Sequence, residues 1–115
     1  MPKVALVYPY FRTRAATELL FAPLGVAYQA SQLHRLGIDA RIFDCTFSTF
    51  EKISESLQTY RPDIVGIYCM VTLSRHTFRI AEMVRAGLPD CLLVAGGPLP
   101  TLYPERFNGP FNIVF

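Results

Sequence analysis

KVALVY, residues Lys3–Tyr8, is a short run of apolar and β-branched side chains that ends at Pro9. Polar and apolar side chains do not alternate along it, so the run predicts a strand that is buried on both faces. Strands of this kind are typical of parallel sheets, whose two faces are covered by helices. We therefore expect an α/β fold from the first residues of the chain.

Strand and helix patterns alternate along the rest of the sequence. Further strands are predicted at residues 39–44, 63–70, 91–95 and 112–115, and a single short turn at 105–107. Helical spacing of apolar residues predicts a helix that opens at 23–25 and is closed by Gly37, and two more at 49–60 and 74–86. This order predicts a flavodoxin-like, doubly wound parallel sheet with strand order 2-1-3-4-5 and helices on both faces. Because no closing helix follows Phe115, we expect residues 1–115 to be one domain cut from a longer protein.

The composition excludes several classes of partner. Half of the 115 residues are hydrophobic (51%), enough for one core, and the net charge of +2 comes from scattered basic residues, so no nucleic-acid surface is expected. No apolar run is long enough to span a bilayer, and no secretion signal precedes the first strand. Cys45, Cys69 and Cys91 lack the spacing of a metal site and suit buried thiols in a reducing compartment, the cytoplasm.

Ligands of an open parallel sheet bind outside the carboxyl ends of its strands, next to the point where the strand order reverses. In this chain those ends are the loops that begin at Tyr8, Met70 and Gly96. The loop over residues 8–22 is long for a strand-to-helix connection, which favours a functional role as much as a partly helical segment that simply packs. Thr72 and Ser74 place two hydroxyls before a helix, where a capping role is the commoner interpretation and a ligand contact the other.

GGPLPT, residues 96–101, is the most informative loop. Two glycines at the end of a strand let a flat ligand approach bare backbone, and the two prolines are expected to hold the loop open, although a plain turn is the alternative.

The nucleotide motifs G-x-G-x-x-G and Walker A are missing, and the first and third strands end in Tyr8-Pro9 and Cys69-Met70 and not in the carboxylates of a phosphoacceptor receiver. The histidines and strand-end aspartates are interpreted as surface residues or caps without catalytic roles: His34, His76, Asp39, Asp44 and Asp63.

Four segments occur in a fixed order, KVALVYP at 3–9, PLGVAY at 23–28, RPDIVGI at 61–67 and VAGGP at 94–98. Together they resemble the amino-terminal cobalamin-binding domain of radical S-adenosylmethionine (SAM) enzymes, and the match covers essentially the whole chain. In that family a barrel with a CxxxCxxC iron–sulfur motif follows. The motif is missing from these 115 residues, so the 4Fe-4S cluster and S-adenosylmethionine are expected in an absent domain, with that barrel as partner. The chain alone is then expected to bind cobalamin without radical chemistry.

The resemblance implies that the nucleotide tail of the corrin enters between the sheet and its flanking helices, with the ring over the strand ends. The residues expected to contact the cofactor are Tyr8, Pro9, Tyr10, Phe11, Thr72, Leu73, Ser74, Gly96, Gly97, Pro98 and Thr101. The wider cobalamin-binding fold often carries Asp-x-His-x-x-Gly after the first strand, whereas residues 8–13 read YPYFRT and contain no histidine. Cobalt is therefore expected to lack an imidazole ligand, with Tyr10 or Phe11 covering that face, or else the site is degenerate.

Three functions remain open from the sequence. The first is a cobalamin-binding domain of a radical enzyme that transfers a methyl group or rearranges a carbon skeleton. The second is a scaffold that has lost its cofactor and packs against the barrel or a partner, which the missing histidine favours and the GGPLPT loop opposes. The third, a different small-ligand enzyme such as a flavin carrier, is weaker because residues 8–13 are not the Ser-, Thr- and Gly-rich phosphate loop of a flavodoxin.

Overall fold

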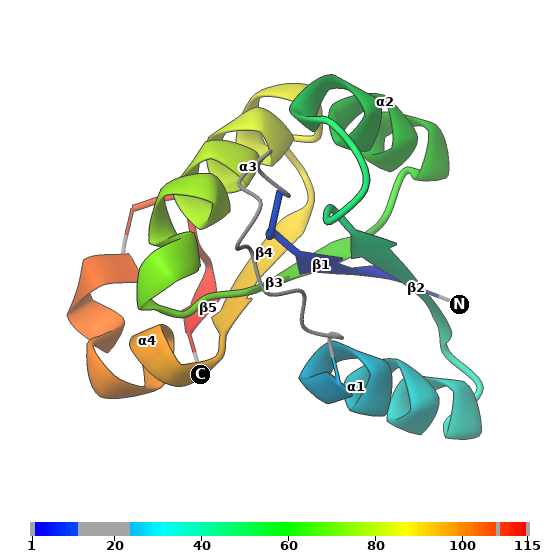
Figure 1. Ribbon diagram of the computed structural model, residues 1–115. Coiled ribbons are helices and arrows are strands. Elements are labelled where there is room, and N and C mark those ends of the chain that lie inside the picture. Colours follow the sequence, from blue (N-terminus) through cyan, green and yellow to red (C-terminus); the bar gives the residue numbers. More distant parts are fainter. Residues whose placement is uncertain (1, 12–23, 108, 115) are drawn as a thin grey trace.

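The computed structural model describes residues 2–11, 24–107 and 109–114. Five parallel strands form one sheet in the order β2-β1-β3-β4-β5, as predicted. The strands are β1 (Lys3–Tyr8), β2 (Asp39–Asp44), β3 (Ile64–Tyr68), β4 (Leu92–Gly96) and β5 (Ile113–Val114). The helices are α1 (Leu24–Arg35), α2 (Phe50–Tyr60), α3 (Ser74–Gly87) and the short α4 (Pro98–Leu102), with 3-10 turns at Val71–Leu73 and Pro104–Phe107 (Figure 1). The flavodoxin-like fold class is therefore confirmed. β3 is shorter than the expected strand at 63–70, because Asp63 forms a bend and Cys69 and Met70 connect the strand to the first 3-10 turn.

Local chemistry explains where the helices start and stop. Thr49 precedes α2, and its hydroxyl oxygen accepts the backbone N–H of Lys52 at 3.2 Å, which satisfies one free donor of the first turn. Gly37 has the positive φ of 77° that ends α1, as the sequence predicted. Arg61 ends α2 in the same left-handed region, with φ of 54°, although it carries a side chain. Within the described residues, no helix is long and apolar enough to cross a membrane.

The direction of each crossover decides which face a helix covers. The step from β1 to β2 runs one way along the sheet, whereas the later steps to β3, β4 and β5 run the other way. Since such crossovers are right-handed, α1 lies on one face while α2 and α3 lie on the opposite face, as Figure 1 shows. Leu99 of α4 and Phe107 join the core on the α2–α3 face, where Phe107 stacks on Phe78 of α3 at 5.1 Å between ring centroids.

This arrangement leaves one face of the sheet half covered. On β3 and β4 the residues that face α2 and α3 are fully buried, such as Val65 at 0% and Leu93 at 0% exposure. The alternate residues of the same strands, which face the α1 side, are all half-buried: Ile64, Gly66, Tyr68, Leu92, Val94 and Gly96. β1, next to α1, is buried from Val4 to Tyr8, as predicted for a strand covered on both faces. The α1 face is therefore packed over β1 and open over β3 and β4.

The GGPLPT segment departs from its expected form. We predicted an open loop held by two prolines, but residues 98–102 form α4, with Pro98 in the first turn and Pro100 buried. Proline suits this place because its fixed φ matches a helix and its missing N–H is not needed there. The prolines therefore close this segment into a helix, and only Gly96 and Gly97 remain as the bare backbone that the prediction required.

Candidate functional site

A groove of about 550 Å³ lies on the open part of the α1 face. It is positioned beside β1 and β3, the adjacent strands between which the strand order reverses, and this is where open α/β sheets bind ligands. Its volume falls within the roughly 300–1,000 Å³ typical of small-molecule sites. The strands contribute the floor and α1 contributes one wall, and the lining residues are Val4, Leu6, Gly25, Val26, Tyr28, Gln29, Gln32, Leu33, Ile64, Gly66, Ile67, Tyr68, Val94, Gly96 and Gly97.

Gly96 and Gly97 were predicted site residues, and both line this groove. A Cβ built on Gly96 would meet no atom within 4 Å, so its missing side chain leaves space that opens into the groove. A Cβ on Gly97 would lie 2.6 Å from the carbonyl oxygen of Cys69, and Gly97 has φ of 111°, which favours glycine. The first glycine therefore keeps the groove open, and the second lets the chain pass against the end of β3.

Backbone hydrogen bonds fix this double-glycine turn. Cys69 donates its N–H to the carbonyl of Gly96 at 2.7 Å, and the N–H of Leu99 donates to the carbonyl of Cys69 at 3.2 Å. The hydroxyl of Thr101, another predicted site residue, donates to the carbonyl of Gly97 at 2.8 Å. Thr101 therefore supports the turn from the first turns of α4, and neither it nor Pro98 lines the groove.

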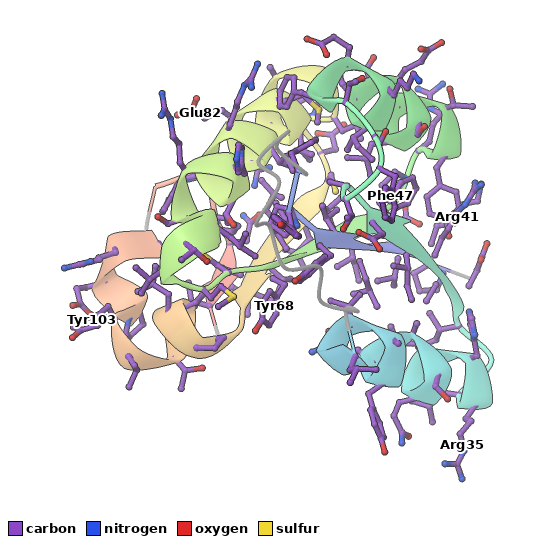
Figure 2. The ribbon with its side chains drawn as sticks, viewed as in Figure 1. Arg35, Arg41, Phe47, Tyr68, Glu82 and Tyr103 are labelled. Carbon is purple, nitrogen blue, oxygen red and sulfur yellow. The ribbon has the colours of Figure 1, made fainter. Side chains whose placement is uncertain are left out.

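A cluster of tyrosines marks the carboxyl end of the groove. The ring of Tyr8 packs edge-on against Tyr10, with 6.2 Å between ring centroids, and lies 5.8 Å from the ring of Tyr68. Figure 2 shows Tyr68 on the α1 side of the sheet, in keeping with its place in the groove lining. Burial, and then the neighbouring Tyr68 and Asp44, raise the pKa of Tyr8 above its ordinary value, so the phenol stays neutral under physiological conditions.

The two remaining residues of the predicted first-strand loop lie around this cluster without lining the groove. Pro9 is fully buried behind the strand end. Phe11 lies 5.1 Å from the ring of His76, centroid to centroid, so His76 is half-buried and not the surface residue we expected. Burial, followed by the charges of Arg79 and Arg75, lowers the pKa of His76, which favours a neutral imidazole.

Residues after β3 have roles that differ from the predicted ones. Ser74 donates its hydroxyl to the carbonyl of Val71 at 3.2 Å, and no side chain caps α3, so the capping interpretation is wrong. Thr72 is exposed, and Leu73 is buried in the apolar cluster beneath α1. The hydroxyl in this region with a buried partner is that of Thr77, which donates to the carbonyl of Tyr68 at 3.2 Å.

Sequence reasoning missed most of the groove floor, in particular Leu6, Gly66 and Val94. Gly66 carried a usable signal, because an isolated glycine within an apolar strand often marks the close approach of a ligand or backbone. Tyr28 also lines the groove, and its ring is 74% exposed. It stood within the PLGVAY segment but was not selected as a site residue.

Other polar groups of the described region serve structure. The carboxylate of Asp44 accepts the N–H and the hydroxyl of Thr46, at 3.0 and 2.6 Å, in the turn after β2. All three cysteines are buried and free, as predicted. Among the residues that the structure describes, no group of three or more His, Cys, Asp and Glu side chains is placed to hold a metal ion.

Comparison with known proteins agrees with this geometry. Residues 13–114 match the family model of the B12 binding domain. Over 85 residues the chain is 33% identical to an uncharacterized methyltransferase, PH0819, of Pyrococcus horikoshii, an alignment that spans 72% of the chain but 18% of that protein. The fold is similar to the crystal structure of a novel cobalamin-binding protein from Desulfitobacterium hafniense DCB-2, with a TM-score of 0.63 and 19% identity, over 96% of this chain and 52% of that one. The chain belongs to the B12-binding domain family.

Proposed function

We propose that this chain binds cobalamin by placing the nucleotide tail of the cofactor in the groove beside α1, with the corrin ring over the carboxyl ends of the strands. The observation that carries the proposal is the half-covered sheet face at the point where the strand order reverses. A whole corrin is far larger than a groove of about 550 Å³, so the groove holds the tail and leaves the ring outside.

The residues present fit such a group. The open space above Gly96 gives a flat ring access to the backbone of β4, and the aliphatic side chains of Leu6, Ile64 and Val94 line the groove around it. At the mouth, Tyr28 presents an exposed ring from α1. Burial of apolar ligand surface against such a floor supplies most of the binding free energy of small-molecule sites.

The corrin ring would then lie near the tyrosine cluster. Tyr10 extends past the end of β1 and contacts Tyr8, so it is the described aromatic residue best placed to cover the lower face of cobalt. No histidine follows β1 at residues 8–13, so we propose binding without an imidazole ligand from this chain. Bound cobalamin supplies a cobalt centre that carries a methyl group between a donor and an acceptor, while the chain binds, orients and shields it.

We further propose that the chain works as part of a longer cytoplasmic enzyme of the radical SAM type that transfers a methyl group. The methyltransferase name of the Pyrococcus relative supports methyl transfer, and the ordered segments KVALVYP, PLGVAY, RPDIVGI and VAGGP support the radical SAM context. The chain spans under a fifth of that relative, which leaves room for a barrel with its 4Fe-4S cluster and S-adenosylmethionine. Three free buried thiols are in keeping with a reducing compartment.

Gel filtration with hydroxocobalamin tests the proposal. The purified chain is mixed with the cofactor and separated from free corrinoid, and the visible spectrum of the protein peak is recorded. We expect stoichiometric corrinoid with a spectrum that lacks histidine coordination. A colourless peak from folded protein would contradict the proposal and favour the scaffold.

A pair of glycine variants shows whether the groove is the site. Gly96→Val places a side chain in the open groove and should weaken retention of the corrinoid. Gly109→Val is the matched control, because an added Cβ there also meets nothing within 4 Å but Gly109 does not line the groove. Equal retention by both variants would contradict the location of the site.

A further inference from the structure

We propose that the groove beside α1 selects corrinoids by their lower base, and that it accepts a benzimidazole and rejects a purine such as adenine. This inference rests on the proposed cobalamin-binding function and adds the chemical class of tail that the groove takes. It follows from the polarity of the floor, the open space above Gly96 and the position of the polar rim.

Among the described strand residues that line the floor, Tyr68 is the one with a hydrogen-bonding side chain, its single phenol. Four of the strand residues that line it, Val4, Leu6, Ile64 and Val94, are aliphatic. The backbone between them is also engaged, because β1, β3 and β4 are each hydrogen-bonded to a neighbouring strand on both sides. A base that enters the floor of the groove therefore meets hydrocarbon, paired backbone and one phenol.

Gly96 makes room for a flat ring, whereas the side chain of Leu6 packs over Gly66 on the neighbouring strand, with its Cδ2 3.2 Å from where an added Cβ would lie. Gly66 pairs in register with Val94 of β4, and Gly96 pairs with Tyr68 of β3, so the two glycines lie diagonally across the strand pair on the same face. The open space above Gly96 borders the ring of Tyr68. A planar aromatic base can lie on this glycine and contact Tyr68, and aromatic rings favour offset or edge-on contacts of that kind.

The polar lining residues belong to the rim and not to the floor. Gln29 and Gln32 project from α1 and are both exposed to solvent. In that position they can hydrogen-bond the ribose or phosphate that links the base to the corrin. They leave the base itself in the apolar part of the groove.

The two classes of base differ in what they bury. A dimethylbenzimidazole presents two methyl groups and a hydrocarbon ring, which match an aliphatic floor. Adenine presents an exocyclic amine and additional ring nitrogens, more polar groups than the single phenol of Tyr68 can pair, so the rest would lose water without gaining partners. One unpaired buried polar group is enough to weaken binding by about tenfold.

The test compares three corrinoids on the unmodified chain by isothermal titration calorimetry. Cobalamin carries the benzimidazole base, pseudocobalamin carries adenine, and cobinamide carries no nucleotide. We expect cobalamin to bind at least about tenfold more tightly than pseudocobalamin, and also more tightly than cobinamide. Gly96→Val should remove the advantage of cobalamin over cobinamide, whereas Gly109→Val should keep it.

The possible failures are distinguishable. Equal affinity for cobalamin and pseudocobalamin, both above cobinamide, would overturn base selection and leave cobalamin binding intact. Equal affinity for cobalamin and cobinamide would show that the tail does not use the groove, and would also overturn the inference. Absence of binding by all three corrinoids would overturn the proposed function itself.

Discussion

Replacement of Gly97 by alanine gives a direct test of the turn that separates the groove from α4. Gly97 has φ of 111° and ψ of −174°, a region of the backbone map that is essentially reserved for glycine. An added Cβ would also lie 2.6 Å from the carbonyl oxygen and 3.0 Å from the amide nitrogen of Cys69. Both atoms belong to the backbone at the buried end of β3, so no side-chain rotation can relieve the contact.

The magnitude follows from these two effects. Forcing alanine into this backbone region costs about 1–3 kcal/mol. Moving the turn away from Cys69 would weaken its hydrogen bonds to Gly96 and Leu99, each of which contributes about 1 kcal/mol. We therefore expect Gly97→Ala to lower the free energy of unfolding by about 3 kcal/mol. At an unfolding entropy of about 2.1 cal/mol/K per residue, this lowers the melting temperature by about 12 °C.

Gly96→Ala is the matched control, because the same change is made one residue earlier where the added Cβ meets nothing within 4 Å. Both substitutions reduce the entropy of the unfolded chain equally, so the difference between the two variants isolates the native turn. Urea unfolding followed by circular dichroism measures both. A difference below about 1 kcal/mol would refute the reasoning, since it would mean that the turn accepts a side chain without strain.

Three further predictions concern stability. The guanidinium of Arg85 donates to the carbonyls of Pro89, Cys91 and Pro110 and to the side chain of Asn112, at 2.7–3.1 Å. Because the single ammonium of a lysine cannot reach all four acceptors, Arg85→Lys should lower the free energy of unfolding in urea by about 2 kcal/mol. A loss no larger than that of Arg35→Lys, made at an exposed position, would contradict this role. Arg61→Gly should raise the free energy of unfolding by about 0.5 kcal/mol, because φ of 54° strains a residue with a side chain more than it strains glycine, and a measured decrease would oppose this. Burial raises the pKa of the Cys45 thiol to about 12, so the unfolded chain loses this proton at a lower pH than the native chain does. The free energy of unfolding should therefore fall as the pH rises from about 9 to about 12. Cys45→Ala should flatten this fall, and an unchanged slope of the free energy against pH would exclude the thiol as its source.

The strands and their order could be predicted because apolar periodicity is a local property. VALVY and IVGIY are runs without charged residues, and Pro9, Gly37 and Gly87 mark where β1, α1 and α3 end. Once strands and helices alternate, right-handed crossovers leave few possible orders, so the sheet followed from the same pattern. The same reasoning failed at residues 98–102, where two prolines indicated an open loop and form a helical turn instead.

The groove could not be predicted in this way, because its lining residues come from four elements that are distant in the sequence. Nothing in the neighbourhood of Val94 or Ile64 along the chain distinguishes their exposed face from the buried face of Leu93. Gly96 and Gly97, at the end of β4, could be predicted because glycine carries a local conformational signal. Val94 and Ile64 became visible only when the strand order placed their shared face beside α1.

The topology itself explains why this face is open. The crossover from β1 to β2 runs opposite to the later ones, so among the described long helices α1 is the one on its face, while α2 and α3 pack on the other. Residues of β3 that alternate along one strand therefore experience different constraints: Val65 is 0% exposed and fixed by the core, while Gly66 beside it lines the groove. The core face can then specify the fold while the groove face adapts to a ligand, and the strands that hold the sheet together also form the floor of the binding site.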